Sequence, residues 1–549
     1  MWFQALGLLL RAAGAAPVDV EIEVVHVQGD EWRAEYRFSE PIQKFTFATR
    51  DQPFRAEWAV DGLVLEAVDG KSVLRRKNGR TFRKATVHLR QYSENSDKAY
   101  RFFIPFTDGS SAVYLGNFVG GAEDCLESDT CGAASLVLRS ELGEPILADG
   151  KLTIAVSGEV SEPNGYAYVG NLPPVESELG MLVIDPGMPG WTIDAIRSLL
   201  PELLAQYADR LGPGLAGKRT FLFGYDESGA GLGVEGGVLG DQVAFSLQGP
   251  LWSEDTHENR MRLEGVAAHE AAHLWNARVA EPPSGIEHSW MHEGGADFLS
   301  QWARVAQGRL ALAEWQVLFD TQVLECAYSL RVGSLQDAVA AKDHKTVYTC
   351  GNVIAMLAGK TVDPLRPAAG HAELWRELLA DTRGGSYDEA AYFAVLSRYP
   401  GGAATIAAIR ELVDTRVPST WFEDNFARAG VTFERRPPEV DRYENRKFGV
   451  RAVTLAVQQD CPTVSLNIRD QNATFADSSS CSALKSVESI DRIGGIPYLE
   501  QGLLAYDYLQ TRCAAAEPIV VQSGQQTFEL PCKTPPPSVP MLTVTAPPL

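Results

Sequence analysis

Two histidines and two glutamates carry the clearest chemistry in this sequence: His269, Glu270, His273 and Glu293. On a helix, residues four positions apart lie one turn above each other. The imidazoles of His269 and His273 can therefore bind one ion while Glu270 lies beside them. Two His and one Glu form a known ligand set of catalytic zinc, which keeps a fourth position for water. The pattern predicts one zinc ion held by His269, His273 and Glu293, with Glu270 as general base.

Two helices must place these side chains. Residues 261–280 are rich in Ala, Leu, Glu and Arg and contain no Pro, which predicts a helix. Pro282 and Pro283 break it, and a second helix is expected to begin near Ser289 and to carry Glu293. The sequence thus predicts that two helices converge on the metal.

Asp297 follows Glu293 by one helical turn. From there it can accept a hydrogen bond from the second ring nitrogen of a ligating histidine, which would fix the tautomer of that histidine. A solvated helix residue is the alternative, and the sequence leaves both open.

The strings around these residues resemble the gluzincin zinc metallopeptidases. Trp290-Met291-His292-Glu293-Gly294-Gly295-Ala296 is similar to the Trp-Leu-Asn-Glu-Gly-Phe-Ala string of the aminopeptidase N family, with His292 in place of Asn and Gly295 in place of Phe. Leu274-Trp275-Asn276 is similar to the string after the second His in the glycyl aminopeptidase family. Members of that family combine a β-rich front, a thermolysin-like catalytic region and a PDZ domain.

A tyrosine further along extends the resemblance. Aminopeptidase N-like enzymes stabilise the oxyanion with a tyrosine hydroxyl from a Tyr-x-Lys-Gly string that opens a helix. Tyr348-Thr349-Cys350-Gly351 is similar, with Cys350 in place of Lys. The resemblance implies that Tyr348 is catalytic, and an ordinary core or surface tyrosine is the alternative.

A glycine-rich segment stands where this clan reads the free amine of its substrate with a Gly-x-Met-Glu-Asn strand. Here Glu235, Gly236 and Gly237 lead towards Asp241, and Met-Glu-Asn is absent. We expect an edge strand that binds an extended peptide through Glu235, Gly236 and Gly237. Glu235 and Asp241 as ordinary polar loop residues are the alternative. The missing motif leaves exopeptidase or endopeptidase action open.

Composition sets the class of protein. With 549 residues, 45% of them hydrophobic, the chain can form several cores, roughly three or four domains. A net charge of −22 argues against nucleic acid and anionic membranes as partners. No interior stretch approaches the roughly 18 apolar residues of a membrane span.

The predicted fold is a multidomain α+β protein, in which alternating strand patterns precede amphipathic helices. The expected parts are a signal peptide at 1–16, a β-rich N-terminal domain at 17–172, a thermolysin-like zinc-binding α/β domain at 173–307, a helical part of the catalytic domain at 308–440, a small PDZ-like domain at 441–533 and a disordered tail at 534–549.

The C-terminal pattern resembles a PDZ domain. Short strands are predicted at 453–457, 519–522 and 527–530, and a strand and turn at 490–496 precede a helical segment at 505–509. The resemblance implies a peptide or protein ligand, although the carboxylate-binding Gly-Leu-Gly-Phe loop is not found.

The N-terminus and the cysteines both indicate export to a periplasm or secretion. Residues 1–16 have a short apolar centre and small residues before Pro17, as in a signal peptide, with a short disordered leader as the alternative. Disulfides imply an oxidising compartment, and buried free thiols are the alternative. Proximity in the sequence pairs the eight cysteines as Cys125–Cys131, Cys326–Cys350, Cys461–Cys481 and Cys513–Cys532.

The function predicted from these features is a zinc peptidase, an aminopeptidase that acts on short peptides. Three alternatives stay open: an endopeptidase of the same clan, hydrolysis of a non-peptide substrate, and a non-catalytic protein that binds peptides through the PDZ-like domain. The sequence does not determine side-chain preference or oligomeric state.

Overall fold

The structure is a computed structural model. It describes residues 18–91, 101–122, 132–148, 150–159, 165–177, 180–214, 219–229, 231–461, 463, 465–468, 472–475, 478–485 and 487–545. The predicted signal peptide and the Cys125–Cys131 pair lie outside these residues. The chain divides into one unit of Met1–Ser198 with Ala216–Val266 and a second unit of Leu199–Leu215 with Ala267–Leu549.

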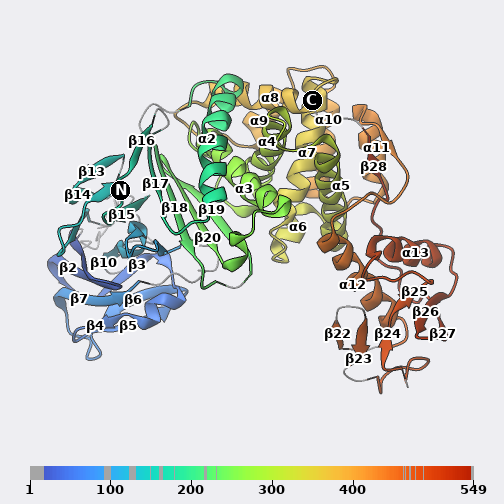
Figure 1. Cartoon of the computed structure of the whole chain (residues 1–549), viewed down its shortest axis with the longest axis horizontal. Helices are drawn as coiled ribbons and strands as arrows, with labels where there is room; N and C mark the ends of the chain where they lie inside the picture. The colour runs from blue at the N-terminus through green and yellow to red at the C-terminus, as the bar shows by residue number, and fades with distance from the viewer. Residues whose placement is uncertain are drawn as a thin grey trace, which may run out of the picture. The chain divides into compact units, whose positions relative to one another are not determined.

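Alternating apolar residues build the largest sheet of the first unit, as predicted for a β-rich N-terminal region (Figure 1). Its strand order is β14-β11-β1-β2-β7-β4, and β1 runs parallel to β11 and antiparallel to β2. Trp32 and Tyr36 of β2 point into the core, each at most 1% exposed. The strands are β1 (Val20–Gln28), β2 (Glu31–Ile42), β4 (Ala59–Val60), β7 (Phe82–Arg90), β11 (Ala134–Ser140) and β14 (Ala155–Glu159).

Two further antiparallel sheets extend this core, and their orders are β10-β3-β6-β5 and β13-β12-β15-β9-β8. Their strands are β3 (Lys44–Arg50), β5 (Val64–Val68), β6 (Lys71–Arg75), β8 (Phe103–Pro105), β9 (Ser111–Tyr114), β10 (Gly120–Ala122), β12 (Ile146–Ala148), β13 (Lys151–Thr153) and β15 (Tyr166–Val169).

A mixed sheet completes the first unit, in the order β16-β17-β18-β20-β19. β17, β18 and β20 run parallel, and β18 and β20 are buried along almost their whole length, as expected for strands covered on both faces. β19 lies at one edge, where the sequence predicted an edge strand. The strands are β16 (Val175–Ser177), β17 (Gly180–Ile184), β18 (Arg219–Asp226), β19 (Gly233–Leu239) and β20 (Gln242–Gln248).

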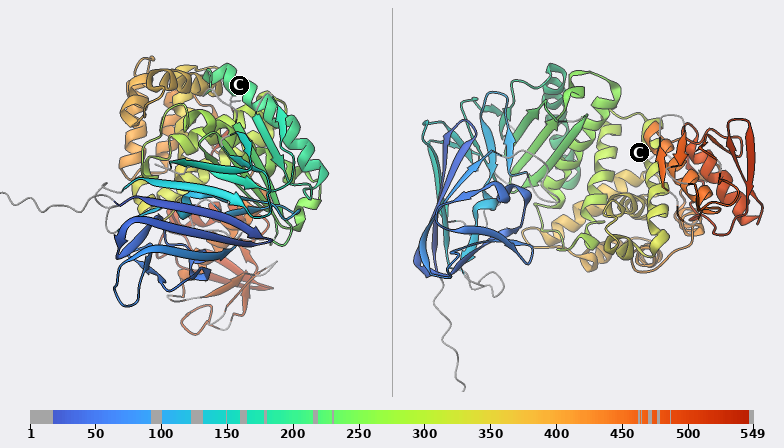
Figure 2. Two further views of the ribbon diagram at one scale, coloured as in Figure 1. Left: turned by 90° about the vertical axis from the view of Figure 1, so that its left-hand side faces the viewer. Right: turned by 90° about the horizontal axis from the view of Figure 1, so that it is seen from below.

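Helices form most of the second unit, as predicted for residues after 308 (Figure 2). α7 is the most buried of them and packs against α4, α5 and α8. None of the described helices is both long and apolar enough to cross a bilayer. The α-helices of the described residues up to 429 are α2 (Gly190–Leu211), α3 (His257–Asn276), α4 (His292–Ala306), α5 (Leu312–Ser329), α6 (Leu335–Ala340), α7 (Thr346–Val362), α8 (Pro367–Thr382), α9 (Glu389–Leu396), α10 (Gly402–Asp414) and α11 (Thr420–Ala429).

The C-terminal part begins with a helix where a strand was predicted. Residues 453–457 lie inside α12 (Arg442–Gln458), which Asp441 caps by accepting a hydrogen bond from the Glu444 N–H at 2.8 Å. A short apolar run fits a strand or a buried helix equally well, and here the buried positions follow the helical repeat. The predicted strands near 519 and 527 and the helix around 505 are present. The remaining elements are β22 (Leu466–Ile468), β23 (Ala473–Phe475), β24 (Ser489–Ile490), β25 (Arg492–Ile493), α13 (Gly502–Ala514), β26 (Ile519–Ser523) and β27 (Gln526–Leu530).

The prediction of a disordered tail is wrong for residues 534–545. β28 (Thr543–Val544) pairs with β21 (Phe433–Glu434), and the Val544 N–H donates to the Asp320 carboxylate at 3.0 Å. Val539 and Leu542 are at most 2% exposed. The prolines prevent a helix, but the apolar residues between them still pack on the helical part.

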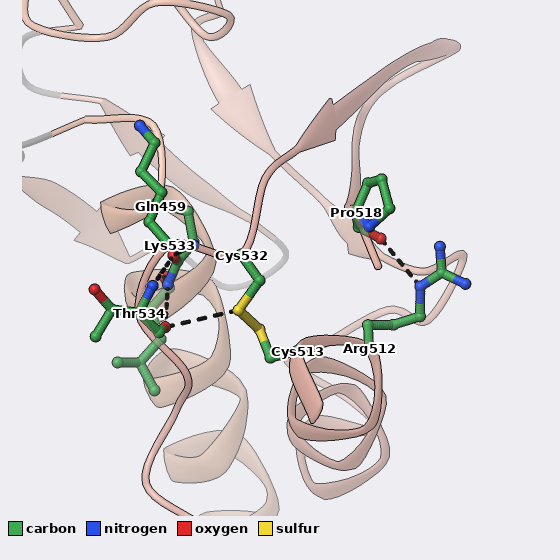
Figure 3. The surroundings of a disulfide bond; sticks show 8 residues. Gln459, Arg512, Cys513, Pro518, Cys532, Lys533 and Thr534 are labelled. Atoms are coloured by element: carbon green, nitrogen blue, oxygen red, sulfur yellow. Dashed lines mark hydrogen bonds between the residues drawn. A yellow bond between two sulfur atoms is a disulfide. The ribbon is translucent and has the colours of Figure 1, made fainter. Parts of the chain in front are cut away.

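The structure forms three of the predicted disulfides, Cys326–Cys350, Cys461–Cys481 and Cys513–Cys532, and no described cysteine is free. Figure 3 shows that Cys513–Cys532 joins α13 to the chain beyond β27. There the Gln459 side-chain oxygen accepts hydrogen bonds from the N–H groups of Lys533 and Thr534 at 2.8 and 2.9 Å.

Candidate metal centre

α3 and α4 bring two imidazoles and a carboxylate to one point in the second unit. Nε2 of His269 lies 3.0 Å from Nε2 of His273, and Oε2 of Glu293 lies 3.2 and 3.3 Å from these two nitrogens. Ligands about 2.1 Å from a tetrahedral ion lie about 3.4 Å from each other. The spacing of the three atoms therefore fits a single zinc ion with a fourth position left for water or substrate.

The second ring nitrogen of each histidine has its own acceptor. His269 Nδ1 lies 2.7 Å from Asp297 Oδ1, and His273 Nδ1 lies 2.9 Å from Asn276 Oδ1. A carboxylate only accepts, and the Asn276 amide nitrogen already donates to the His292 carbonyl at 2.8 Å. Both histidines therefore donate from Nδ1, which leaves a lone pair on each Nε2 for the metal.

Two asparagines in this centre were not predicted from the sequence. Asn276 lies three residues after His273, so the helical repeat could have placed it on the same face. Asn352 of α7 donates to Asp297 Oδ2 at 3.4 Å and to the Tyr348 carbonyl at 3.2 Å. No local sequence pattern indicates a role for Asn352, because its contact with Asp297 depends on how α4 packs against α7.

The carboxylates of the centre have opposite pKa shifts. Burial raises the pKa of Glu270, which makes its carboxylate a stronger base than that of an exposed glutamate. Burial also opposes ionisation of Glu293, but His269 and His273, which donate from Nε2 as well when they are protonated and positively charged, lower its pKa well below the ordinary value overall. Burial lowers the pKa of His292 to about 4, so this imidazole is neutral at pH 7. Glu293 is thus suited to bind a cation and Glu270 to take a proton.

Tyr348 lies in the first turn of α7 and faces the centre. Its ring centroid is 6.0 Å from that of His269. Burial raises the pKa of the Tyr348 hydroxyl, and the nearby carboxylates of Glu293 and Asp297 raise it further. The hydroxyl therefore keeps its proton and can act as a hydrogen-bond donor.

Glycines set the distance between the helices that carry Glu293 and Tyr348. A Cβ on Gly294 would lie 2.3 Å from Cα of Gly351, so α4 and α7 touch backbone to backbone. A Cβ on Gly295 would lie 3.0 Å from the ring of Trp375. Trp375 therefore occupies the space that a larger side chain at position 295 would need.

The predicted substrate-binding residues Glu235, Gly236 and Gly237 lie on β19, in the first unit, whereas the residues predicted to bind the metal lie in the second. Oε2 of Glu235 forms an ion pair with Nε of Arg101 at 2.5 Å, and the Arg101 side chain is 5% exposed. The Glu235 carboxylate is therefore already paired with a buried cation. Asp241 lies at the turn between β19 and β20, where its carbonyl accepts a hydrogen bond from Thr220 at 3.0 Å.

Comparisons with known proteins place the fold. No protein-family model and no curated protein matches the chain. A crystal structure of an aminopeptidase N family protein from Idiomarina loihiensis matches 96% of this chain and 96% of its own length, at 13% identity and a TM-score of 0.58. The chain therefore shares its fold with that protein over nearly its full length, as the gluzincin resemblance implied.

Two other solved structures match less closely. A variant of the M1 zinc metallopeptidase of Deinococcus radiodurans, bound to a Tyr-Ser-Ala substrate, matches 73% of this chain and 94% of its own at 13% identity and a TM-score of 0.45. The structure of yeast LTA4 hydrolase in complex with bestatin matches 81% of this chain and 72% of its own, at 12% identity and a TM-score of 0.46.

Proposed function

We propose that the chain is a zinc-dependent peptidase and that it acts as an aminopeptidase on short peptides. The observation that carries the proposal is the convergence of His269, His273 and Glu293 within 4.8 Å, with Nδ1 of each histidine held by its own acceptor. Two imidazole nitrogens and one carboxylate oxygen suit zinc and leave a position open for catalysis.

Each side chain of the centre has a separate task. Zinc bound here would lower the pKa of a water molecule towards neutrality and polarise the substrate carbonyl. Glu270 takes the proton of the attacking water and passes it to the leaving amine. The Tyr348 hydroxyl donates a hydrogen bond to the carbonyl oxygen as negative charge develops there, a contribution typically worth about 3 kcal/mol. Asp297 and Asn276 keep the imidazoles in the orientation that metal binding requires.

The edge strand β19 supports a peptide as the substrate. A strand at the edge of a sheet, such as β19, can hydrogen-bond an extended peptide, and we assign Glu235, Gly236 and Gly237 to this contact. One observation favours the second candidate, an endopeptidase of the same fold. Because Arg101 already neutralises Glu235, that carboxylate is a poor reader of a free amine.

Export to a periplasm or the outside is part of the proposal. The three disulfides of the described residues support it, because such bonds persist in oxidising compartments. The PDZ-like character of residues 441–533, a ligand there and the predicted domain bounds stay predictions.

A mixed pool of peptides, half with free and half with acetylated N-termini, tests the proposal. The pool is incubated with the wild type and with Glu270→Gln, and the products are identified by mass spectrometry. An aminopeptidase removes single N-terminal residues from the free peptides, and the variant does not. Cleavage inside both kinds of peptide would establish the endopeptidase instead. A wild type that cleaves neither kind contradicts the proposed function.

A further inference from the structure

Tyr348 lies at a helix start that has no side-chain cap. α7 begins at Thr346, and the N-cap residue Lys345 makes no capping hydrogen bond through its side chain. The N–H groups of Thr346, Tyr348 and Thr349 donate instead to the carbonyl oxygens of Asp343 and Lys345, which lie before the helix. A helix start held only by such backbone contacts opens more easily than the helix interior. The Tyr348 hydroxyl therefore depends on other contacts to stay in one place.

A disulfide holds the chain directly after this tyrosine. Cys350, two residues beyond Tyr348, is bonded to Cys326 in the last part of α5. Both cysteines are fully buried, and α5 packs along α7. The bond therefore ties the first turns of α7 to a long helix that does not itself contribute a ligand.

The next residue, Gly351, contacts the helix that carries Glu293. A Cβ on Gly351 would lie 2.5 Å from the Trp290 carbonyl oxygen and 2.7 Å from Cα of Gly294. Two glycines in contact present no side chains that interlock, so this contact alone does little to resist rotation of α7 about its axis. The neighbouring disulfide supplies a fixed point against such rotation.

We propose that the Cys326–Cys350 disulfide is a positioning element of the active centre. It fixes the start of α7, and with it the Tyr348 hydroxyl, beside Glu293. Loss of the bond leaves the metal in place and lowers turnover, because the oxyanion donor is then misplaced. The inference rests on the proposed function for its kinetic consequence and on the packing of α7 alone for its structural one.

The kinetic test removes the bond in two ways. Cys326→Ala with Cys350→Val keeps an apolar filling, and Cys326→Ser with Cys350→Ser serves as a second pair in case the first folds poorly. We expect full zinc content, a kcat lowered about tenfold or more and a nearly unchanged KM, because a shift of about 1 Å in a catalytic group can cost up to a hundredfold. In a Tyr348→Phe background the same substitutions should cost little more, since both changes act through one hydroxyl.

The matched control is the disulfide drawn in Figure 3. Cys513→Ser with Cys532→Ser removes a bond from the C-terminal part, and kcat should stay at the wild-type value. The positioning role is overturned if the control loses as much kcat as the Cys326 and Cys350 variants do. It is equally overturned if their loss adds fully to that of Tyr348→Phe.

Hydrogen–deuterium exchange of the zinc-loaded proteins tests the structural half without any substrate. Amides 346–350 should exchange faster in the Cys326 and Cys350 variants than in the wild type and in the control, while those of α4 stay protected. Unchanged exchange at 346–350 contradicts the proposal. A wild type that hydrolyses no peptide contradicts the proposed function, and the exchange result still decides whether the disulfide holds α7.

Discussion

At the scale of single residues, the two histidines proposed to bind the metal are held by different acceptors. His269 donates to the carboxylate of Asp297, and His273 donates to the amide oxygen of Asn276. A carboxylate makes the imidazole more basic than an amide does, so His269 is expected to be the stronger donor to the metal. Asn276 contributes mainly orientation, because its amide nitrogen is fixed on the His292 carbonyl.

Removing the Asn276 side chain should therefore weaken metal binding. Asn276→Ala leaves His273 Nδ1 without its acceptor, and zinc affinity is expected to fall about 10- to 100-fold. Competition with a chromophoric chelator measures this. Asn425→Ala is the matched control, since Asn425 is also buried and donates to a helix carbonyl, that of Trp421, but has no contact with the centre. Equal zinc affinity of Asn276→Ala and the wild type would exclude the orienting role.

At the scale of elements, the centre depends on how closely α4 approaches α7. The contact of Gly294 with Gly351 brings the backbones together and places Tyr348, one turn before Gly351, near Glu293. The proposed centre thus takes two ligands from one helix, the third ligand from a second helix and the hydroxyl from a third helix.

Gly351→Ala should separate these helices. The added Cβ would meet the backbone of Trp290 and Gly294, which cannot move aside as a flexible side chain can. Overpacking of this kind typically costs about 1–3 kcal/mol of unfolding free energy, and kcat should fall as Tyr348 moves away. Thermal unfolding and steady-state kinetics measure both. Gly385→Ala, whose Cβ would find its nearest atom 3.5 Å away, should behave like the wild type. A fully stable and active Gly351→Ala would show that the close approach is dispensable.

The helices that carry the centre could be predicted from the sequence, because they depend on local residue spacing. The helix expected at 261–280 is α3 (His257–Asn276), and the helix expected from Ser289 is α4 (His292–Ala306). Structure that depends on contacts between distant parts of the chain was not predicted. Residues 453–457 are helical because α12 buries one of its faces. Residues 534–545 are ordered because the Val544 N–H donates to Asp320 and β28 pairs with β21. The helical repeat could have indicated Asn276 as the acceptor of His273, but the hydrogen bond that Asn352 donates to Asp297 follows from packing that no short pattern encodes.

At the scale of the whole molecule, residues far apart in the chain close the second unit. Asp320 of α5 is 1% exposed and accepts the hydrogen bond of the Val544 N–H. Burial raises the pKa of Asp320 to about 7, although this hydrogen bond and the Arg436 guanidinium act in the opposite direction. The hydrogen bond that attaches β28 to α5 therefore involves a titratable group, the Asp320 carboxyl.

This pKa gives stability a dependence on pH. The unfolded Asp320 has a pKa of about 4, so between about pH 4 and pH 7 the folded chain holds a proton that the unfolded chain has lost. The contribution of Asp320 to the free energy of unfolding is greatest below about pH 4. It declines by up to about 1.4 kcal/mol per pH unit as the pH rises from about 4 to about 7. Asp320→Asn should remove this decline, as calorimetric unfolding midpoints from pH 4 to 8 would show.

The comparison for Asp320→Asn is Asp424→Asn, an exposed residue of α11. Its midpoints should follow the wild type at every pH. If the unfolding midpoints of Asp320→Asn and the wild type change in parallel with pH, the buried carboxyl does not control the pH dependence of stability.

The most direct test of the account is a zinc titration of the metal-free protein, with bound metal and peptide turnover measured together in the wild type and in Glu270→Gln. We predict one zinc per chain in both proteins, turnover that rises with bound zinc in the wild type, and turnover at least about a hundredfold lower in the variant. Wild-type turnover that does not depend on zinc, or near-normal turnover of zinc-loaded Glu270→Gln, would contradict the mechanism.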